Sequence, residues 1–384
     1  MNQRWSVQQG SLEILEMPFY WRLSDSSKVV PEIPPRLGIR VTCNQEYDYL
    51  EYLPTTKEWK AMECAYRQNA NIGFVNPESG QIHTYGSSVN RFFLDVVNNF
   101  SPKKIYEIGC GAGFSIEFLK ENGWQVTGID PSEYSLEWSK RLGFKLENTF
   151  FDGDTVAGEA DLVYCNDVFE HVPRVEKFSC DVYKALKPGG VFCFSTTNSS
   201  QSIALGDISM LEHQHVNMFT ERSIYLILSA AGFSDVRIKG GTYGNTFHVV
   251  AIKGLSGKNQ IEIPPVSCIG YFERAQSKLE AFGKFYNSTA GRCQHYVPLR
   301  CIPYLATVGD FGDSDLFDSN TSWQGKKIDG YNRAIKSISD IARHPEGSFF
   351  IGSLTFYEEI KRTLLEKGFR EQEIFSISNI KATA

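Results

Sequence analysis

The sequence predicts an α/β protein of three parts, with a nucleotide-binding domain between two smaller units. Three observations predict this organisation. A glycine-rich turn at residues 107–113 follows an apolar strand and precedes a helix, within a domain that we assign to residues 81–255. Residues 256–384 alternate between strand-like and helix-like segments, which is typical of a parallel α/β unit. Residues 1–80 combine short strands with one short helix, as in a small α+β domain.

The elements around the glycine turn follow the order strand, turn, helix, strand and acid. The apolar pair Ile105-Tyr106 precedes the turn, a helix-like run begins at Phe114, and a second strand ends at Asp130. Glycines let the backbone bend sharply and approach a ligand closely, and a helix start offers free N–H groups. An acid about 20 residues further on can accept hydrogen bonds from both hydroxyls of a ribose. This order therefore predicts a nucleotide site.

The spacing within the turn distinguishes between nucleotides. Gly109, Gly111 and Gly113 form G-x-G-x-G, whereas dinucleotide binders place G-x-G-x-x-G around a pyrophosphate. Glu107 stands two residues before the first glycine, and its carboxylate would repel a pyrophosphate. The same carboxylate would favour a ligand that carries an amine and a sulfonium. The turn resembles the first motif of the class I methyltransferases that depend on S-adenosylmethionine (SAM), which implies SAM as the cofactor.

Other segments follow the order of the same family. Asp130-Pro131-Ser132 resembles its ribose-binding turn, residues 160–172 resemble its fourth strand with the following acidic and histidine residues, and residues 186–195 resemble the turn into its fifth strand. The resemblance implies a Rossmann-like methyltransferase fold. Periodicity alone would leave open a glycine turn in another doubly wound sheet.

The resemblance also implies roles for individual residues. The turn would surround the amino-acid part and ribose of SAM, the segment after the second strand would bind ribose and adenine, and the end of the fourth strand would face the methyl group. A tyrosine before the first helix could close over the cofactor. The expected cofactor-binding residues are Tyr85, Glu107, Gly109, Gly111, Gly113, Asp130, Pro131, Ser132, Asn166 and Asp167.

The C-terminal part is expected to be a second Rossmann-like unit without a dinucleotide, because it lacks a glycine-rich phosphate loop. Arg300, at a predicted helix start, could hold an anion such as a sugar phosphate. The alternative is a purely structural lid. The expected strands are 294–298, 315–318 and 348–353, and the expected helices are 272–286, 300–307 and 356–367.

The three-part layout resembles the sugar C-methyltransferases and related uncharacterised enzymes of bacterial polysaccharide gene clusters. The chain departs from that family twice. The family's N-terminal domain usually holds zinc on four cysteines, but only Cys43 and Cys64 stand here, so we expect no structural zinc. The family's Y-x-E-H motif aligns with Met210 to His213, which lacks the tyrosine and puts carbon methylation in doubt.

His213 is the expected general base, oriented by Glu212, because a histidine titrates near working pH. Other interpretations remain open. Glu212, His213 and His215 could hold a metal, although no further ligand at a suitable spacing elsewhere in the chain supports it and we expect none. The segment could also be a polar loop without a catalytic role. For His171 a structural or pocket-lining role is expected.

Composition limits the possible partners. The net charge is −6 and the isoelectric point is about 5.8, which argues against a nucleic-acid partner. The chain starts without an apolar signal-peptide core and has no run long enough to span a bilayer. Nine scattered cysteines without a C-x-x-C pair are typical of reduced thiols, so a cytoplasmic location is expected.

Together these features predict a SAM-dependent methyltransferase of a small polar acceptor, with a nucleotide-linked sugar or glycan precursor as the expected substrate. A non-sugar metabolite is the alternative acceptor. A reading of another class is a catalytically inactive scaffold in glycan assembly, against which the complete set from Glu107 to Asp130 argues. The sequence predicts neither the methylated atom nor the oligomeric state.

Overall fold

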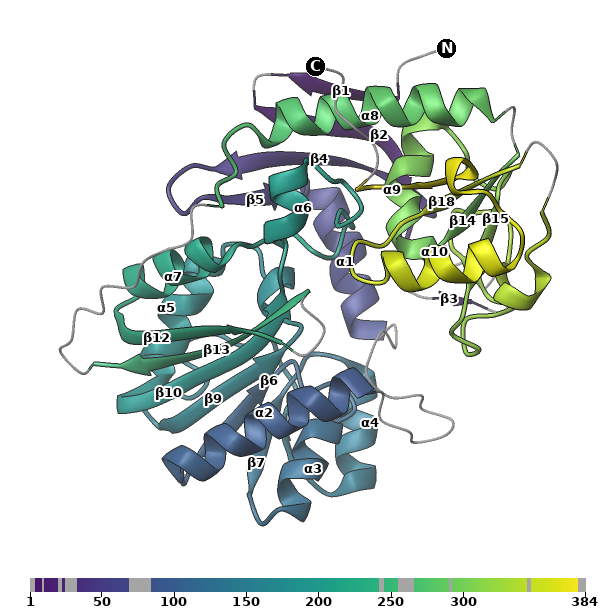
Figure 1. Ribbon diagram of the computed structural model, residues 1–384. Coiled ribbons are helices and arrows are strands. Elements are labelled where there is room, and N and C mark those ends of the chain that lie inside the picture. The colour runs from purple at the N-terminus through teal and green to yellow at the C-terminus, as the bar shows by residue number, and fades with distance from the viewer. Residues whose placement is uncertain are drawn as a thin grey trace.

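The computed structural model contains three sheets of five or more strands, each with its own flanking helices (Figure 1). The structure describes residues 4–8, 10–19, 23–24, 33–68, 84–241, 245–254, 266–289, 292–343 and 347–378. The two predicted domain divisions, after residues 80 and 255, fall outside these ranges and stay predictions. No helix in the described part of the chain has both the length and the apolar character needed to cross a bilayer.

The central sheet has seven strands in the order β12-β13-β10-β9-β6-β7-β8. The five strands from β10 to β8 run parallel, and β12 and β13 form an antiparallel hairpin at one edge. The strands are β6 (Ile105–Ile108), β7 (Val126–Ile129), β8 (Lys145–Glu147), β9 (Ala160–Asn166), β10 (Leu186–Thr197), β12 (Phe233–Gly240) and β13 (Thr246–Lys253). A Rossmann-like α/β fold, as expected from the sequence, is therefore present in this part.

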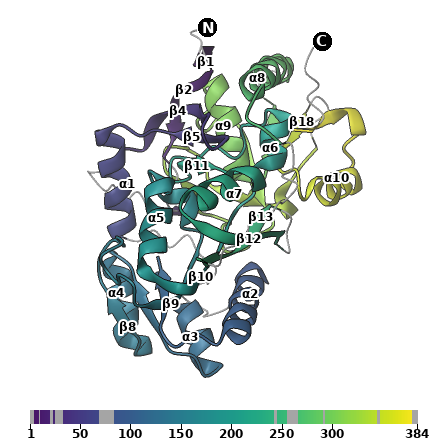
Figure 2. The same ribbon diagram turned by 90° about the vertical axis from the view of Figure 1, so that its left-hand side faces the viewer.

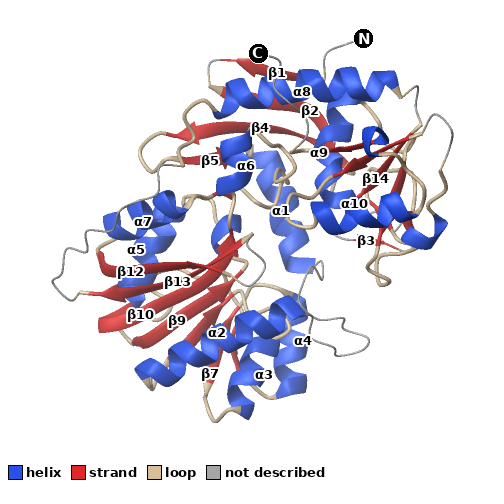
Figure 3. Cartoon of the chain, in the orientation of Figure 1, coloured by secondary structure: helices blue, strands red, loops and turns tan. Residues whose placement is uncertain are grey.

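Helices cover both faces of this sheet, because its strands carry apolar side chains on both faces (Figure 3). On one face Phe93 and Val97 of α2 pack with Leu162. On the other face Val182 of α5 and Ile224 of α7 share a core with neighbouring strand residues. The helices are α2 (Thr84–Phe100), α3 (Phe114–Glu121), α4 (Glu133–Leu142), α5 (Val175–Ala185) and α7 (Glu221–Ala230).

The N-terminal sheet is antiparallel, with the order β1-β2-β4-β5-β11. Its last strand, β11 (Asn217–Met218), comes from the segment that follows β10 and α6 (Ser200–Leu205), so two distant parts of the chain complete one sheet. Helix α1 (Thr56–Gln68) leaves this sheet and packs beside α4 (Figure 2). The remaining strands are β1 (Trp5–Gln8), β2 (Ser11–Pro18), β4 (Arg36–Asn44) and β5 (Tyr49–Tyr52).

The C-terminal sheet is fully parallel, with the order β17-β15-β14-β18-β19. The parallel sheet expected from strand and helix alternation is therefore present. The elements are α8 (Tyr271–Ser288), β14 (Cys293–Tyr296), α9 (Pro298–Val308), β15 (Asp315–Asp318), β17 (Ile335–Ser337), β18 (Ser348–Ile351), α10 (Tyr357–Glu366) and β19 (Ile374–Ser376).

The outer two units share one hydrophobic core. Ile14 and Val41 of the N-terminal sheet belong to the same buried cluster as Phe282 and Leu305 of α8 and α9. A short ladder between β3 (Leu23–Ser24) and β16 (Lys327–Ile328) also joins them. They form a single body beside the central domain (Figure 1).

Candidate active site

The glycine turn crosses the carboxyl ends of the central strands, where open α/β sheets bind ligands. Gly109 and Gly113 have φ values of 71° and 73°, in the left-handed region that favours glycine. A Cβ atom on Gly109 would collide with Val168, and one on Gly113 would collide with the ring of Phe144. Both positions therefore need glycine for backbone conformation and for close packing.

Asp130 ties the two halves of the nucleotide site together. Its Oδ2 accepts a hydrogen bond from the Gly111 N–H at 2.9 Å. Its Oδ1 accepts from the Ser132 hydroxyl at 2.6 Å and the Ser135 hydroxyl at 2.9 Å. A carboxylate has about four acceptor sites, so Oδ2 can still accept from a ribose hydroxyl. Pro131 and Ser132 line the same cavity as Asp130.

Glu107 is buried at the end of β6, with 3% of its surface exposed. The Tyr164 hydroxyl donates a hydrogen bond to its Oε2 at 3.0 Å. Burial raises the pKa of Glu107 well above its ordinary value, although this hydrogen bond opposes the rise. A ligand with an ammonium or sulfonium group would restore the charged carboxylate, which makes Glu107 selective for a cationic partner.

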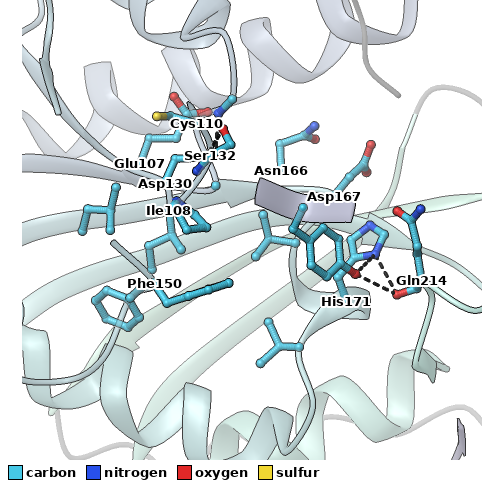
Figure 4. A pocket seen from close by; sticks show the side chains of 18 of the residues that line it. Glu107, Ile108, Cys110, Asp130, Ser132, Phe150, Asn166, Asp167, His171 and Gln214 are labelled. Carbon is cyan, nitrogen blue, oxygen red and sulfur yellow. Dashed lines mark hydrogen bonds between the residues drawn. The ribbon is translucent and has the colours of Figure 1, made fainter. Parts of the chain in front are cut away.

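A cavity of about 460 Å³ lies against the glycine turn, as Figure 4 shows from close by. Asn166 and Asp167, at the end of β9, line it as expected. The Oδ1 atom of Asn166 is buried without a hydrogen-bond partner among the described residues, so it is available to a ligand. Gly113 lies just outside the lining, at the start of α3. The side chain of Tyr85 lies outside the described residues, although its backbone belongs to α2.

The opposite wall of the cavity carries imidazole and carboxylate groups. Glu212 and His215 line it, and the Nδ1 atom of His215 lies 2.6 Å from a Glu212 oxygen. Burial alone would raise the pKa of Glu212, but the charge and hydrogen bond of His215 lower it to about 2. Burial alone would lower the pKa of His215, but Glu212 raises it above its ordinary value. The two groups form an ion pair inside the cavity wall.

His171 lies beside this pair, with its ring centroid 4.8 Å from that of His215. Its Nδ1 lies 2.8 Å from the carbonyl oxygen of Gln214, as the dashed line in Figure 4 shows. Burial, together with the charge of His215, lowers the pKa of His171. The ring therefore stays neutral, and because a carbonyl can only accept, Nδ1 carries its hydrogen. The pocket-lining role expected for His171 agrees with this position.

His213 stands outside the cavity, which corrects its expected role as the general base. Its ring is 1% exposed and packs edge-on against Phe19 and Tyr52. Its Nε2 lies 3.3 Å from the carbonyl oxygen of Leu37, and burial lowers its pKa to about 4. His213 points into the outer core, while Glu212 and His215 face the cavity.

Several lining residues were missed by the sequence analysis. Trp59 and Tyr66 reach the cavity from α1, and Phe150 and Phe151 reach it from the loop after β8. The Tyr66 hydroxyl lies 3.4 Å from Nδ1 of His171. Aromatic residues in a short N-terminal helix do not by themselves indicate a ligand site, and only the tertiary structure brings α1 to the cavity.

Comparisons with known proteins agree with the geometry of the central part. Residues 79–238 match the family model described as a methyltransferase domain. A ubiquinone biosynthesis O-methyltransferase of Idiomarina loihiensis is 31% identical over 156 residues, which cover 36% of this chain and 64% of the relative. The mitochondrial ubiquinone biosynthesis O-methyltransferase of Schizosaccharomyces pombe is 31% identical, with 34% and 53% covered. The chain thus spans about half to two thirds of the length of these relatives.

Among solved structures, human N-acetylserotonin methyltransferase in complex with SAM is 21% identical, with 43% of this chain and 52% of that chain covered and a TM-score of 0.37. The two curated relatives are named as O-methyltransferases of ubiquinone biosynthesis, so they give the expected sugar acceptor no support. Their similarity covers little more than a third of this chain, and the three-part layout has no support from it.

Proposed function

We propose that this chain, whose central part is a SAM-dependent methyltransferase domain, transfers the methyl group of SAM to a hydroxyl oxygen of a small acceptor. One observation carries the proposal. A glycine turn held by Asp130, with a buried Glu107, faces a wall of His171, His215 and Glu212 across a single cavity. Such a cavity can hold a cationic methyl donor on one side and a hydroxyl on the other.

The donor side follows from charge and hydrogen bonding. Glu107 would sit near the ammonium group of SAM, and the remaining acceptor capacity of Asp130 would take a ribose hydroxyl. Phe150 and Tyr134 line the cavity near this turn and would flank the adenine. Asn166 would then lie close to the sulfonium, with its buried Oδ1 directed at positive charge. No metal is needed to activate the leaving group, because the sulfonium leaves as a neutral thioether.

The acceptor side must remove a proton from the hydroxyl as the carbon–oxygen bond forms. The neutral ring of His171 lies where that proton would leave, and His215, paired with Glu212, lies beside it. Glu212 acts on the acceptor through His215 and is therefore a positioning residue in this proposal. The expected pairing of Glu212 with a histidine is kept, but with His215 in place of His213.

The acceptor class that we favour is a phenolic hydroxyl. Tyr66 packs against the ring of His171 and Trp59 packs against Tyr66, while Phe151 and Phe178 also line the cavity. Such aromatic surface suits a planar apolar body better than a sugar ring. The named relatives are O-methyltransferases, which supports oxygen as the methylated atom here.

A nucleotide-linked sugar is the second candidate, and Arg300 favours it. This arginine lies in the first turn of α9 in the C-terminal unit, its Nη1 donates to the Ser209 carbonyl at 3.4 Å, and its charge acts on both Glu212 and His215. A phosphate group of an acceptor that extended beyond Glu212 and His215 would meet this cation of the C-terminal unit.

The test is methyl transfer from labelled SAM to two panels, one of mono- and dihydroxybenzenes and one of nucleotide-linked sugars. Products are identified by mass and by the NMR position of the new methyl group, and SAM binding is measured separately by calorimetry. Phenolic O-methyl products would support the first candidate, and methylated sugars would support the second. Absence of SAM binding would contradict the enzyme and leave the scaffold reading.

A further inference from the structure

Three side chains meet beneath the acceptor side of the cavity: Glu170, His171 and His215. The first two follow β9 in a 3-10 turn (Phe169–His171), and the third precedes β11. Each offers one possible ligand atom, and the three atoms lie within 4.8 Å of one another. One ion could reach all of them after small side-chain rotations, since metal–nitrogen and metal–oxygen bonds in such sites are about 2.0–2.2 Å.

Each of the three side chains is already held by its other polar atom. Thr196 donates to Oε2 of Glu170 at 2.8 Å. Nδ1 of His171 faces the Gln214 carbonyl at 2.8 Å, and Nδ1 of His215 faces Glu212 at 2.6 Å. Metal-binding histidines typically donate their second N–H to a carbonyl or carboxylate in this way, which fixes the ring and directs Nε2 at the metal. In His215, which carries a proton on both nitrogens while it is paired with Glu212, the ion would displace the Nε2 proton.

The second carboxylate oxygen of Glu170, Oε1, has no structural role that explains its position in the protein without a ligand. The side chain is 0% exposed, and its Oε1 has no hydrogen-bond partner among the described residues. A buried carboxylate oxygen without a partner is costly. His171 and His215 are the other two possible ligands beside Glu170. Neither Nε2 atom has a hydrogen bond to the described part of the chain.

We propose that Glu170, His171 and His215 bind one divalent transition-metal ion such as Zn²⁺. Two imidazoles and one carboxylate form a donor set suited to such ions, and three protein ligands leave at least one coordination position open. His171 and His215 both line the cavity, so that open position faces the acceptor. The sequence analysis expected no metal, and the metal site that it weighed consisted of Glu212, His213 and His215. The proposed donor set departs from both.

The role of the ion rests on the proposed function. An acceptor hydroxyl bound at the open position loses its proton more readily, because the cation stabilises the oxyanion. The oxygen then forms its bond to the methyl carbon while the carbon–sulfur bond breaks. The electron pair of that bond returns to sulfur, and the proton leaves to solvent. The products are the methyl ether, neutral S-adenosylhomocysteine and H⁺.

The test is a calorimetric titration of chelator-treated full-length protein with Zn²⁺ alone. We expect one tight site per chain, and an affinity at least about tenfold weaker in Glu170→Gln and in His215→Gln. His248→Gln is the matched control, because this histidine stacks on Phe92 away from the cluster. SAM affinity, measured on each variant, reports whether the central domain still folds.

Three results separate this proposal from the proposed function. Zn²⁺ affinity that is equal in the wild type, Glu170→Gln and His215→Gln would overturn the cation site, even if methyl transfer were observed. Zn²⁺ binding confined to the millimolar range would overturn it as well. Tight binding that both substitutions weaken, without methyl transfer to any acceptor, would support the cation site and count against the proposed function.

Discussion

The carboxylate of Asp130 both holds the backbone of the glycine turn and faces the cavity. It joins the glycine turn to the following helix start through Gly111, Ser132 and Ser135, and it still offers acceptor capacity to a ligand. His213 differs from Asp130, because the sequence predicted a catalytic role for it and the structure shows a structural one. Its ring holds the segment before β11 against the N-terminal sheet, and this places Glu212 and His215 at the cavity.

Replacement of Asp130 by alanine should weaken SAM binding by at least about tenfold, because it removes a ligand for ribose and loosens the glycine turn. Calorimetric titration with SAM measures the change. Asp154→Ala is the control, since that carboxylate lies on the surface and pairs with Lys184. Equal SAM affinity in Asp130→Ala and the wild type would mean that the ribose lies elsewhere.

His295 in β14 should make stability depend on pH. Its side chain is 0% exposed, both ring nitrogens lack a hydrogen-bond partner among the described residues, and burial lowers its pKa to about 4 although Asp310 opposes the shift. Between about pH 6.5 and pH 4 the unfolded chain binds a proton that the folded chain excludes. Stability should therefore fall as pH decreases through this window, by about 1.4 kcal/mol per unit.

His295→Phe should remove this contribution, since phenylalanine cannot bind a proton. Denaturant unfolding of both proteins at pH 7, 6 and 5 gives the difference between the two slopes. Carboxylates titrate in both proteins, so only the difference reports His295. Parallel slopes would show that His295 is not the group responsible.

At the scale of elements, the cavity depends on segments from different parts of the chain. The 212–218 segment is fixed to the N-terminal sheet by β11 and by the Tyr52 N–H, which donates to the Val216 carbonyl at 2.8 Å. Helix α1, which follows β5 of the same sheet, adds Trp59 and Tyr66. The N-terminal unit therefore builds the wall at which we propose that the acceptor binds, while the central turn builds the wall that we propose for SAM.

Helix α7 begins directly after β11 and depends on its capping box. The Thr220 hydroxyl accepts from the Ser223 N–H at 3.2 Å, and the Ser223 hydroxyl accepts from the Thr220 N–H at 2.9 Å. Thr220→Ala should lower the free energy of unfolding by about 1 kcal/mol. Chemical denaturation measures this loss, with Thr321→Ala in an exposed turn as the control. A loss no larger than that of the control would show that the cap contributes little.

At the scale of the whole molecule, the N- and C-terminal units share one hydrophobic core, so we expect them to unfold together. Leu305 of α9 is 0% exposed and belongs to the cluster that contains Ile14 and Val41 of the N-terminal sheet. The positive charge of Arg300, in the same helix, helps to lower the pKa of Glu212. The C-terminal unit therefore packs against the N-terminal sheet that holds Glu212 and His215 at the cavity.

Leu305→Ala should destabilise the outer body by about 2–5 kcal/mol, because it leaves a cavity in the shared core. Hydrogen exchange measured by mass spectrometry should show lost protection in both β2 and β14, with β6 unchanged. Leu119→Ala is the matched control, since Leu119 lies in the core of the central sheet. Loss confined to β14 would mean that the two units unfold independently.

The sequence by itself determined the central fold and the donor side of the site. The turn from Glu107 to Gly113 and the acid at Asp130 are close in sequence, and local rules of backbone conformation and strand order suffice to bring them together. The parallel C-terminal sheet was also predictable from alternation, although its three-residue strands β17 and β19 are too short to show a periodic pattern.

Only the tertiary structure decided the opposite wall of the cavity, at which we propose that the acceptor binds. His171 and His215 are distant in sequence, and they meet because β11 joins the N-terminal sheet while β9 lies in the central one. In the irregular segment from Glu212 to His215 no fixed period says which side chain faces inward, so the choice between His213 and His215 could not be made from spacing. Burial of His213 in the shared core made that choice, because the outer body supplies its partners.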